Sequence, residues 1–192
     1  MQLLFATSNA NKVKEIQSLL PEGFSLLGLI DIGFNDDIPE TADTIEGNSL
    51  LKAQFIANNF NRVCFSEDTG LEIVALNGRP GVRTARYAGE QACNQDNISL
   101  VLKEMNAITE RKARFKTVIS FFDGKEFKQF EGICNGHIAT DTKGNDGFGY
   151  DPIFIPDGEV RTFAEMTLTE KNKFSHRKKA FNQFLEYLKD NK

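Results

Sequence analysis

Short apolar runs alternate with segments of helical spacing in the first third of the chain. Leu3 to Ala6 is long enough for a buried strand, and the apolar positions from Val13 to Leu20 lie on one face of a helix that Pro21 ends. Leu26 to Ile30 predicts a second strand. A chain that alternates strand and helix in this way favours an α/β fold, in which helices pack against a sheet.

The rest of the chain continues this mixture. Turn signals, helical spacing and capping residues predict further elements. Up to residue 105 they are an acidic loop at Asp36–Glu40, a helix from about Thr44 to Asn59, strands at Val63–Phe65 and Leu71–Leu76, and a helix through Ile98–Met105 capped by Asn94. A hairpin follows, in which Phe115–Phe122 pairs with a strand from Glu126 to about Ile133 or Ile138 around the turn Asp123-Gly124. The last elements are a short strand at Pro152–Ile155, a short helix from Thr162, and a final helix capped by Ser175.

Composition limits the possible functions. The chain has 192 residues, which suits one buried core, and its net charge of −4 argues against a general electrostatic surface for nucleic acid. Its three cysteines (Cys64, Cys93 and Cys134) lack CxxC spacing and cannot all pair with one another, which favours reduced thiols in a cytoplasmic protein. The sequence shows no signal peptide and no run approaching the ~20 apolar residues of a membrane helix. We therefore expect a single cytoplasmic domain over residues 1–192.

Hydrogen-bond donors follow the first predicted strand, in the segment Thr7 to Lys12. A strand that leads into a helix start presents unpaired N–H groups and the positive end of the helix dipole to an anion. Lys12 opposes that dipole, so a bound phosphate would explain its position. Capping of the helix by Ser8 or Asn9 explains the segment equally well, and it is not a P-loop.

Carboxylates follow the strand predicted at Val63–Phe65, so Ser66 to Gly70 would lie at a strand end. Glu67 and Asp68, with Glu40 from the acidic loop, carry the hard oxygen ligands that Mg²⁺ prefers. Hydrolysis of a triphosphate needs such a cation and a group that positions water. A turn in which Asp and Thr bond their own backbone is the alternative, and by itself the commoner one.

Two later segments combine aromatic, acidic and basic residues. In Gly147 to Pro152 the glycines let the backbone approach a ligand, an aromatic ring could stack on a base, and Asp151 could accept a proton from a ring N–H. Lys171 and the run Ser175-His176-Arg177 bring positive charge to a helix start, which a ligand with acceptor atoms would explain. A turn with an aromatic anchor and a solvated charged helix are the respective alternatives.

The order and content of these segments resemble the inosine/xanthosine triphosphate pyrophosphatase family, hydrolases that remove non-standard purine nucleotides. The matching runs span residues 6 to 177. They are Ala6 to Lys12, Glu46 to Ala53, Glu67 to Leu71, Asn77 to Gly81, Ala85 to Gly89, Gly147 to Pro152, and Ala164 to Met166 with Lys171 and Ser175 to Arg177.

The resemblance implies a fold and an activity. The fold would be an elongated mixed α/β sheet with flanking helices and two lobes around a central cleft, in a homodimer. The activity would be Mg²⁺-dependent cleavage of ITP, dITP or XTP to the monophosphate and pyrophosphate. A nucleotide would be the only partner besides the second copy, with no nucleic acid and no membrane.

The resemblance also implies roles for individual residues. Asp68 and Lys12 would be catalytic, with Asp68 accepting a proton from water, and Asp68 and Glu40 would hold Mg²⁺. The substrate-binding residues would be Thr7, Ser8, Asn9, Ala10, Asn11, Lys12, Thr69, Phe148, Gly149, Tyr150, Asp151, Lys171, His176 and Arg177. Many members have Asp-Asp-Ser-Gly in place of Glu67 to Gly70, so either Glu40 or Glu67 can be the second metal ligand.

Other functions fit parts of the same sequence. A related pyrophosphatase could act on modified pyrimidines or damaged bases. A non-catalytic nucleotide sensor would bind the same ligand, although the presence of Asp68 and Lys12 disfavours it. A nucleic-acid-binding module is disfavoured by the negative net charge.

Overall fold

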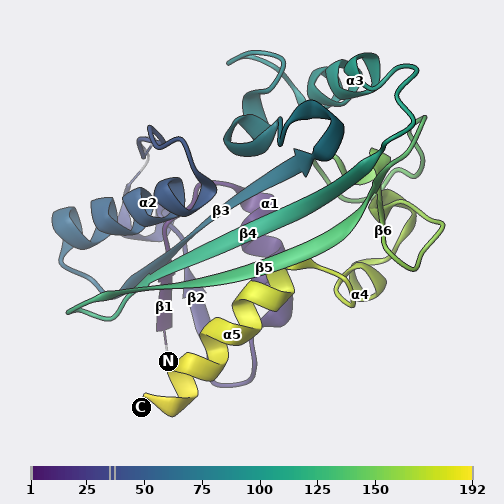
Figure 1. Ribbon diagram of the computed structural model, residues 1–192. Helices are drawn as coiled ribbons and strands as arrows, with labels where there is room; N and C mark the ends of the chain where they lie inside the picture. The colour runs from purple at the N-terminus through teal and green to yellow at the C-terminus, as the bar shows by residue number, and fades with distance from the viewer. Residues whose placement is uncertain (1, 35, 37, 192) are drawn as a thin grey trace. The chain divides into compact units, whose positions relative to one another are not determined.

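One mixed sheet organises the part of the chain that the computed structural model describes, residues 2–34, 36 and 38–191 (Figure 1). Its strand order is β2-β1-β3-β4-β5-β6, with β1 parallel to β2 and β3, and β5 antiparallel to β6. The strands are β1 (Gln2–Phe5), β2 (Ser25–Leu27), β3 (Cys64–Ile73), β4 (Lys112–Phe122), β5 (Phe127–Ile138) and β6 (Phe154–Pro156). The helices are α1 (Ala10–Leu19), α2 (Ile45–Phe60), α3 (Asn94–Glu104), α4 (Leu168–Lys171) and α5 (His176–Asp190). This architecture confirms the predicted α/β class.

The chain divides into two compact units. Unit 1 consists of residues 1–68, 117–132 and 177–192, and unit 2 of residues 69–116 and 133–176. The three long strands β3, β4 and β5 each continue from one unit into the other.

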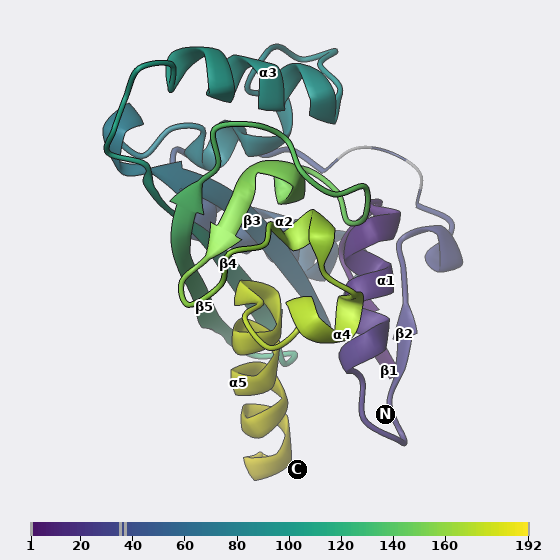
Figure 2. The same ribbon diagram turned by 90° about the vertical axis from the view of Figure 1, so that its right-hand side faces the viewer.

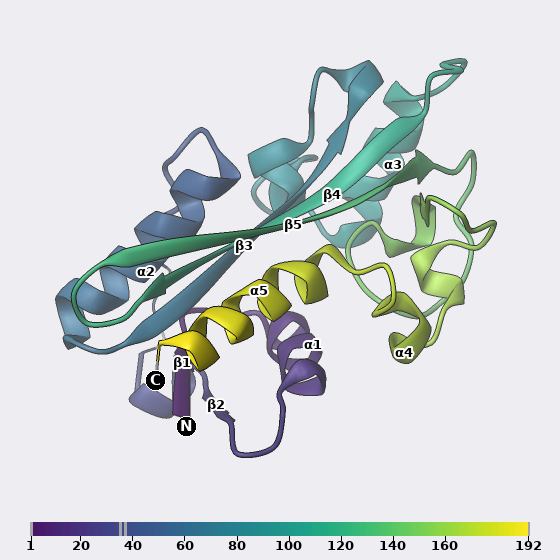
Figure 3. The same ribbon diagram turned by 60° about the horizontal axis from the view of Figure 1, so that its bottom comes forward.

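Unit 1 has helices on both faces of its strands. Leu3 and Phe5 of β1 pack with α1 and α5, whereas Leu4 and Ala6 pack with α2, because successive side chains of a strand point to opposite faces. Figure 3 shows α1 and α5 on one side of these strands and α2 on the other. Figure 2 shows α1 running alongside β1 and β2.

Capping residues and a proline mark the ends of helices α1 and α2 in unit 1. Asn9 caps α1, and Pro21 follows two residues after its last residue. Thr44 caps α2 by accepting a hydrogen bond from the backbone N–H of Gly47 (3.0 Å), and Asn61 ends α2 in the left-handed conformation.

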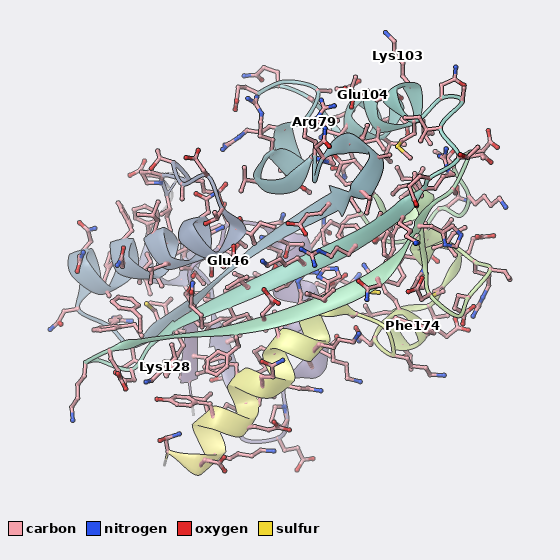
Figure 4. The ribbon with its side chains drawn as sticks, in the orientation of Figure 1. Glu46, Arg79, Lys103, Glu104, Lys128 and Phe174 are labelled. Carbon is pink, nitrogen blue, oxygen red and sulfur yellow. The ribbon has the colours of Figure 1, made fainter. Side chains whose placement is uncertain are left out.

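Unit 2 buries one face of its strands and leaves the other open. Leu71 and Ile73 of β3 pack with residues of β4, β5 and α3 in one core. On the opposite face Glu72 pairs with Arg114 at 2.5 Å, in a shallow groove of about 510 Å³. At the edge of this unit Arg79 pairs with Glu104 at the end of α3 (3.2 Å), as Figure 4 shows.

The structure corrects the prediction for residues 63–76. Two strands were expected, with Ser66 to Gly70 at the end of the first or in a turn, but Glu67 and Asp68 lie inside the continuous strand β3. The prediction was wrong because a polar run usually marks a turn, whereas here the polar side chains are buried and satisfied by ion pairs. The predicted strand Leu71–Leu76 ends at Ile73, and Val74–Leu76 forms a 3₁₀ turn.

Several smaller boundaries also differ. Cys93, not Asn94, precedes α3, and the Asp96 carboxylate accepts a hydrogen bond from the Cys93 N–H (2.8 Å). Asp151–Ile153 forms a 3₁₀ turn before the short strand β6. The strand expected at Leu26–Ile30 is only Ser25–Leu27. The predicted acidic loop includes Asp37, which lies outside the described residues.

Among the described residues, every helix is too short or too polar to cross a membrane. The sulfur atoms of the three cysteines, Cys64, Cys93 and Cys134, are not joined in disulfides.

Candidate active site

The predicted phosphate segment lies between β1 and the start of α1 in unit 1. The Asn9 side-chain oxygen accepts hydrogen bonds from the backbone N–H groups of Asn11 (3.0 Å) and Lys12 (3.3 Å), so the capping alternative is realised. Thr7 in turn accepts a hydrogen bond from the Asn9 N–H (3.2 Å). Ser8 and Ala10 are exposed with Asn9 and Asn11, as residues that meet a solvated anion must be.

Lys12 turns away from solvent toward β3. Its ammonium lies 3.5 Å from the Glu67 carboxylate and donates to the Glu67 backbone carbonyl (3.3 Å). Burial lowers the pKa of Lys12, and the Glu67 carboxylate opposes that shift. Lys12 is therefore fixed in place by one residue of β3.

Glu67 is held from its other side by Arg177, the second residue of α5. The Arg177 Nε and Nη2 atoms donate to the two Glu67 carboxylate oxygens at 2.7 and 2.8 Å, a bidentate pair. The Nη1 atom of Arg177 donates to Glu15 of α1. Because both of its oxygens are bonded to Arg177, Glu67 is poorly suited to be the second metal ligand that the sequence left open.

Glu40 and Asp68 converge on a single cation. The Lys52 ammonium of α2 lies 2.6 Å from Glu40 and 2.7 Å from Asp68. Burial raises the pKa of Asp68, against the pull of the Lys52 and Lys12 ammonium groups. Burial also disfavours the charged form of Lys52, but Asp68 and Glu40 outweigh it and the pKa of Lys52 lies above its ordinary value.

Close packing of α2 on the sheet explains how Lys52 reaches Asp68. The Ser49 hydroxyl, one turn before Lys52, donates to the Val118 carbonyl (3.0 Å), and the Ser66 hydroxyl donates to the Ser49 carbonyl (2.5 Å). Such small side chains let the helix approach β3, on which Ser66 and Asp68 share a face.

Lys52 is the functional residue that the sequence reasoning missed. It lies in one of the matching runs, but no role was predicted for it. A signal was available, because Lys52 falls among Ser49, Ala53 and Ile56 on the buried side of α2, where an unpaired lysine would be costly.

The position of Glu40 is set by the start of α2. The Asn48 side-chain oxygen accepts a hydrogen bond from the Ala42 backbone N–H (2.9 Å) and so fixes the segment that follows Glu40. At Gly47 a Cβ atom would lie 2.6 Å from the Ala42 Cβ, so this segment packs where only glycine leaves room.

The donor set of this cluster fits a divalent metal ion. Two carboxylates already share one cation, and Mg²⁺ is commonly bound through one or two carboxylates together with phosphate oxygens. Among the described residues, no group of three or more acidic, histidine or cysteine side chains is placed to hold a metal ion.

Unit 2 contains the second predicted cluster, built around a buried ion pair. The Lys171 ammonium of α4 lies 2.8 Å from the Asp151 carboxylate, and both side chains are 5% exposed. The same ammonium lies over the rings of Phe148 (5.0 Å) and Phe163 (5.4 Å), where a cation is attracted to the ring faces.

The turn before Asp151 holds its carboxylate in place. The Asp151 Oδ2 atom accepts a hydrogen bond from the Phe148 backbone N–H (2.9 Å). At Gly147 φ is +79°, and a Cβ atom would overlap the Asp151 carboxylate, so both conformation and space require glycine there. No atom lies within 4 Å of the Cβ position at Gly149.

The other predicted residues of unit 2 differ in exposure. Tyr150 is buried in the core, and its hydroxyl donates to the Thr84 carbonyl (2.9 Å). His176 is buried and stacks on Phe115, with ring centroids 4.8 Å apart. Phe148 and Thr69 are half-buried. Phe148 is therefore the ring of this cluster best suited to meet a ligand.

Carboxylates paired with buried lysines on a mixed sheet are the arrangement expected of an α/β enzyme that acts on a phosphorylated ligand. The chain belongs to the Ham1 family, whose model matches residues 3–187. The resemblance that the sequence motifs predicted is thereby confirmed.

Named relatives and solved structures agree with this membership. The chain is 50% identical to the dITP/XTP pyrophosphatase of Flavobacterium psychrophilum over 99% of its length and 100% of the relative. It is 44% identical to the enzyme of the same name from Bacillus subtilis, with 97% and 96% covered. Its fold superposes on the Ham1 protein of Staphylococcus aureus with a TM-score of 0.90, at 35% identity and full coverage of both chains.

Proposed function

We propose that this chain hydrolyses the non-canonical purine nucleoside triphosphates ITP, dITP and XTP to the monophosphate and pyrophosphate, and so removes them from the nucleotide pool. The observation that carries the proposal is the convergence of Glu40 and Asp68 on Lys52. Cleavage of a phosphoric anhydride needs carboxylates for a metal ion and a proton acceptor for water, and this cluster supplies both. The names of the relatives support the same activity.

In the proposed reaction, water cleaves the anhydride between the α- and β-phosphates. Bound Mg²⁺, held by Glu40 and Asp68, would offset the charge of the phosphate oxygens. Asp68 accepts a proton from the attacking water, and Lys12 neutralises the charge of the triphosphate. Residues Thr7 to Asn11 donate hydrogen bonds to phosphate oxygens, and Thr69 contacts the substrate.

Base choice follows from hydrogen-bond complementarity in unit 2. Hypoxanthine and xanthine present O6 as an acceptor and N1–H as a donor, and adenine reverses both. We assign Asp151 as the acceptor for N1–H and Lys171 as the donor to O6, because the two groups already form a buried pair. Phe148 stacks on the base, and Gly149, Tyr150 and His176 complete its surroundings. Arg177, which the resemblance also places among the substrate-binding residues, is buried in unit 1, where its guanidinium bonds Glu67 and Glu15.

A single assay tests the activity. Pyrophosphate release is measured from ITP, XTP, dITP, GTP and ATP, with and without Mg²⁺. We expect kcat/KM for ITP to exceed that for ATP by at least about a hundredfold, because ATP leaves buried polar groups unpaired. Equal values would refute the base assignment, and binding of ITP without pyrophosphate release would identify a nucleotide sensor.

We further propose that the protein is a cytoplasmic homodimer and that residues 1–192 act as one domain. The three cysteines lack CxxC spacing in the sequence, which supports reduced thiols in a cytoplasmic protein. Light scattering of the purified protein tests the oligomeric state, and cell fractionation tests the location.

A further inference from the structure

Four buried or half-buried charges in unit 1 form a closed ring. Lys12 and Glu15 are three residues apart, so they share one side of α1. Lys12 pairs with Glu67 of β3, Glu67 pairs with Arg177 of α5, and Arg177 pairs with Glu15. The backbone of α1 closes the ring between Glu15 and Lys12.

The ring alternates in sign and is neutral as a whole. Glu15, Glu67 and Arg177 are 6%, 1% and 2% exposed, so none of these three can exchange its partner for bulk water. Arg177 stands between the two carboxylates, and its charge is shared by both. If Glu15 lost its charge, the guanidinium would lose one of these two carboxylates and compete more strongly with Lys12 for Glu67.

Stability alone does not account for such a ring. Replacing a buried ion pair with apolar residues often leaves the free energy of unfolding unchanged or raises it. Apolar surroundings are available here, because Ile16, next to Glu15, is buried in the core between α1 and the sheet. The proposed function places one member of the ring, Lys12, on the phosphates. Glu15 is linked to that ammonium through Arg177 and Glu67, so it can act on the position of Lys12.

We propose that Glu15 is a positioning residue for the triphosphate site, because it holds Arg177 and thereby leaves Glu67 able to fix the Lys12 ammonium. Glu15 itself touches no reacting atom. This inference rests on the proposed function, since it assigns Lys12 to the phosphates.

Calorimetric titration tests the proposal without turnover. Inorganic pyrophosphate probes the phosphate residues and inosine probes the base residues, each with wild-type protein, Glu15→Gln and Glu15→Asp. We expect Glu15→Gln to weaken pyrophosphate binding about tenfold, the effect of losing one charge-assisted hydrogen bond. Inosine binding should change less than about twofold, since Asp151 is held by Lys171 and by the Phe148 N–H within unit 2, whereas Glu15 belongs to unit 1. Glu15→Asp should lie between wild type and Glu15→Gln.

Glu186→Gln on α5 is the matched control, because Glu186 is exposed, and it should bind both probes as wild type does. Unchanged pyrophosphate binding in a folded Glu15→Gln variant, or equal loss for both probes, overturns the proposal. If Glu15→Gln does not fold, the pyrophosphate and inosine affinities of Glu15→Asp are compared with those of wild type by the same criterion. Failure of both variants to fold also overturns it, because the role of Glu15 would then be structural.

A double-mutant comparison adds a readout that a structural role would not move. The Lys12→Met variant lacks the ammonium through which Glu15 is proposed to act. Adding Glu15→Gln to it should therefore cause no further loss of pyrophosphate affinity. Additive losses would contradict the proposal. If wild-type protein binds pyrophosphate but releases none from ITP, the proposed activity fails while the role of Glu15 is still measured.

Discussion

At the scale of single residues, the site depends on carboxylates that are each bonded to a particular cation. Asp68 and Glu40 share Lys52, Glu67 is bonded to Arg177, and Asp151 is bonded to Lys171. Because each of these pairs is largely buried, its geometry is fixed before substrate arrives, which is what a preorganised site requires.

Asp68→Asn is expected to reduce kcat for ITP by about 10² to 10⁴, the usual contribution of a proton acceptor. The amide keeps the shape of the side chain but cannot accept the proton of water. Initial rates of pyrophosphate release measure the effect, and circular dichroism verifies the fold. A variant with near-normal kcat would exclude Asp68 as the acceptor.

Gly147→Ala is expected to raise KM for ITP, because the new Cβ atom would displace the Asp151 carboxylate. Gly158→Ala is the matched control. Gly158 also has positive φ (+86°), but no atom lies near its Cβ position. Both variants should lose about 1 kcal/mol in unfolding free energy from backbone strain, measured by urea denaturation. Only Gly147→Ala should change KM, and equal KM values would contradict the assigned role of Asp151.

The sequence predicted candidate site residues more readily than their partners. Lys12, Asp68, Asp151 and Lys171 were predicted because each stands in a short run that resembles a motif of the family. Lys52 and Glu15 were missed, since each occupies one position of an otherwise ordinary amphipathic helix. Their roles depend on ion pairs with residues far along the chain, and no single-sequence pattern reports such pairs.

At the scale of elements, Lys171 depends on a short helix with a capping box at its start. The helix α4 has only four residues, yet its last residue is Lys171. The Glu170 carboxylate accepts hydrogen bonds from the backbone N–H (2.9 Å) and hydroxyl (3.0 Å) of Thr167, and pairs with Arg161 (3.0 Å). This capping box compensates for the short length of α4.

Stability should depend on pH through Glu170. Hydrogen bonds from the Thr167 backbone and from Arg161 lower the pKa of Glu170 to about 2. A depressed pKa contributes stability above the unfolded pKa of about 4.3, and this contribution is lost as pH falls toward 2. Glu170→Gln should therefore be less stable than wild type at pH 6, and the difference should shrink in denaturant titrations at pH 3. A constant difference would exclude this role of Glu170.

Element type was more predictable than element boundaries. The strand, turn and strand at residues 115–138 were predicted from apolar runs around Asp123-Gly124, and β4 and β5 confirm them. The single strand β3 was predicted as two, because its central polar residues look like a turn until their buried partners are known. Tertiary ion pairs thus overrode a local signal.

At the scale of the whole molecule, two compact units share three strands. The hydrophobic cores are separate: residues of α1, α2 and α5 contribute to those of unit 1, and residues of α3 to that of unit 2. β3, β4 and β5 nevertheless run through both units without a break.

We expect residues 1–192 to unfold in one cooperative transition. Loss of either core would unpair the ends of strands on which the other core is built. Urea titrations followed by far-ultraviolet circular dichroism and by tyrosine fluorescence should give the same midpoint. Tyr187 lies against a core of unit 1, and Tyr150 lies in the core of unit 2. Two separate midpoints would show that the units unfold independently.

The continuity of β3 also limits how the length of this chain can vary. Ser66 and Asp68 face Lys52 and its helix, whereas Leu71 and Ile73 face the core of unit 2. One residue inserted between Asp68 and Thr69 would reverse the faces of every later position in the strand. Leu71 and Ile73 would then point away from their core, although no site residue had been replaced. Homologous chains of other lengths should therefore carry their insertions and deletions in the loops, and residues 64–73 should keep a constant spacing.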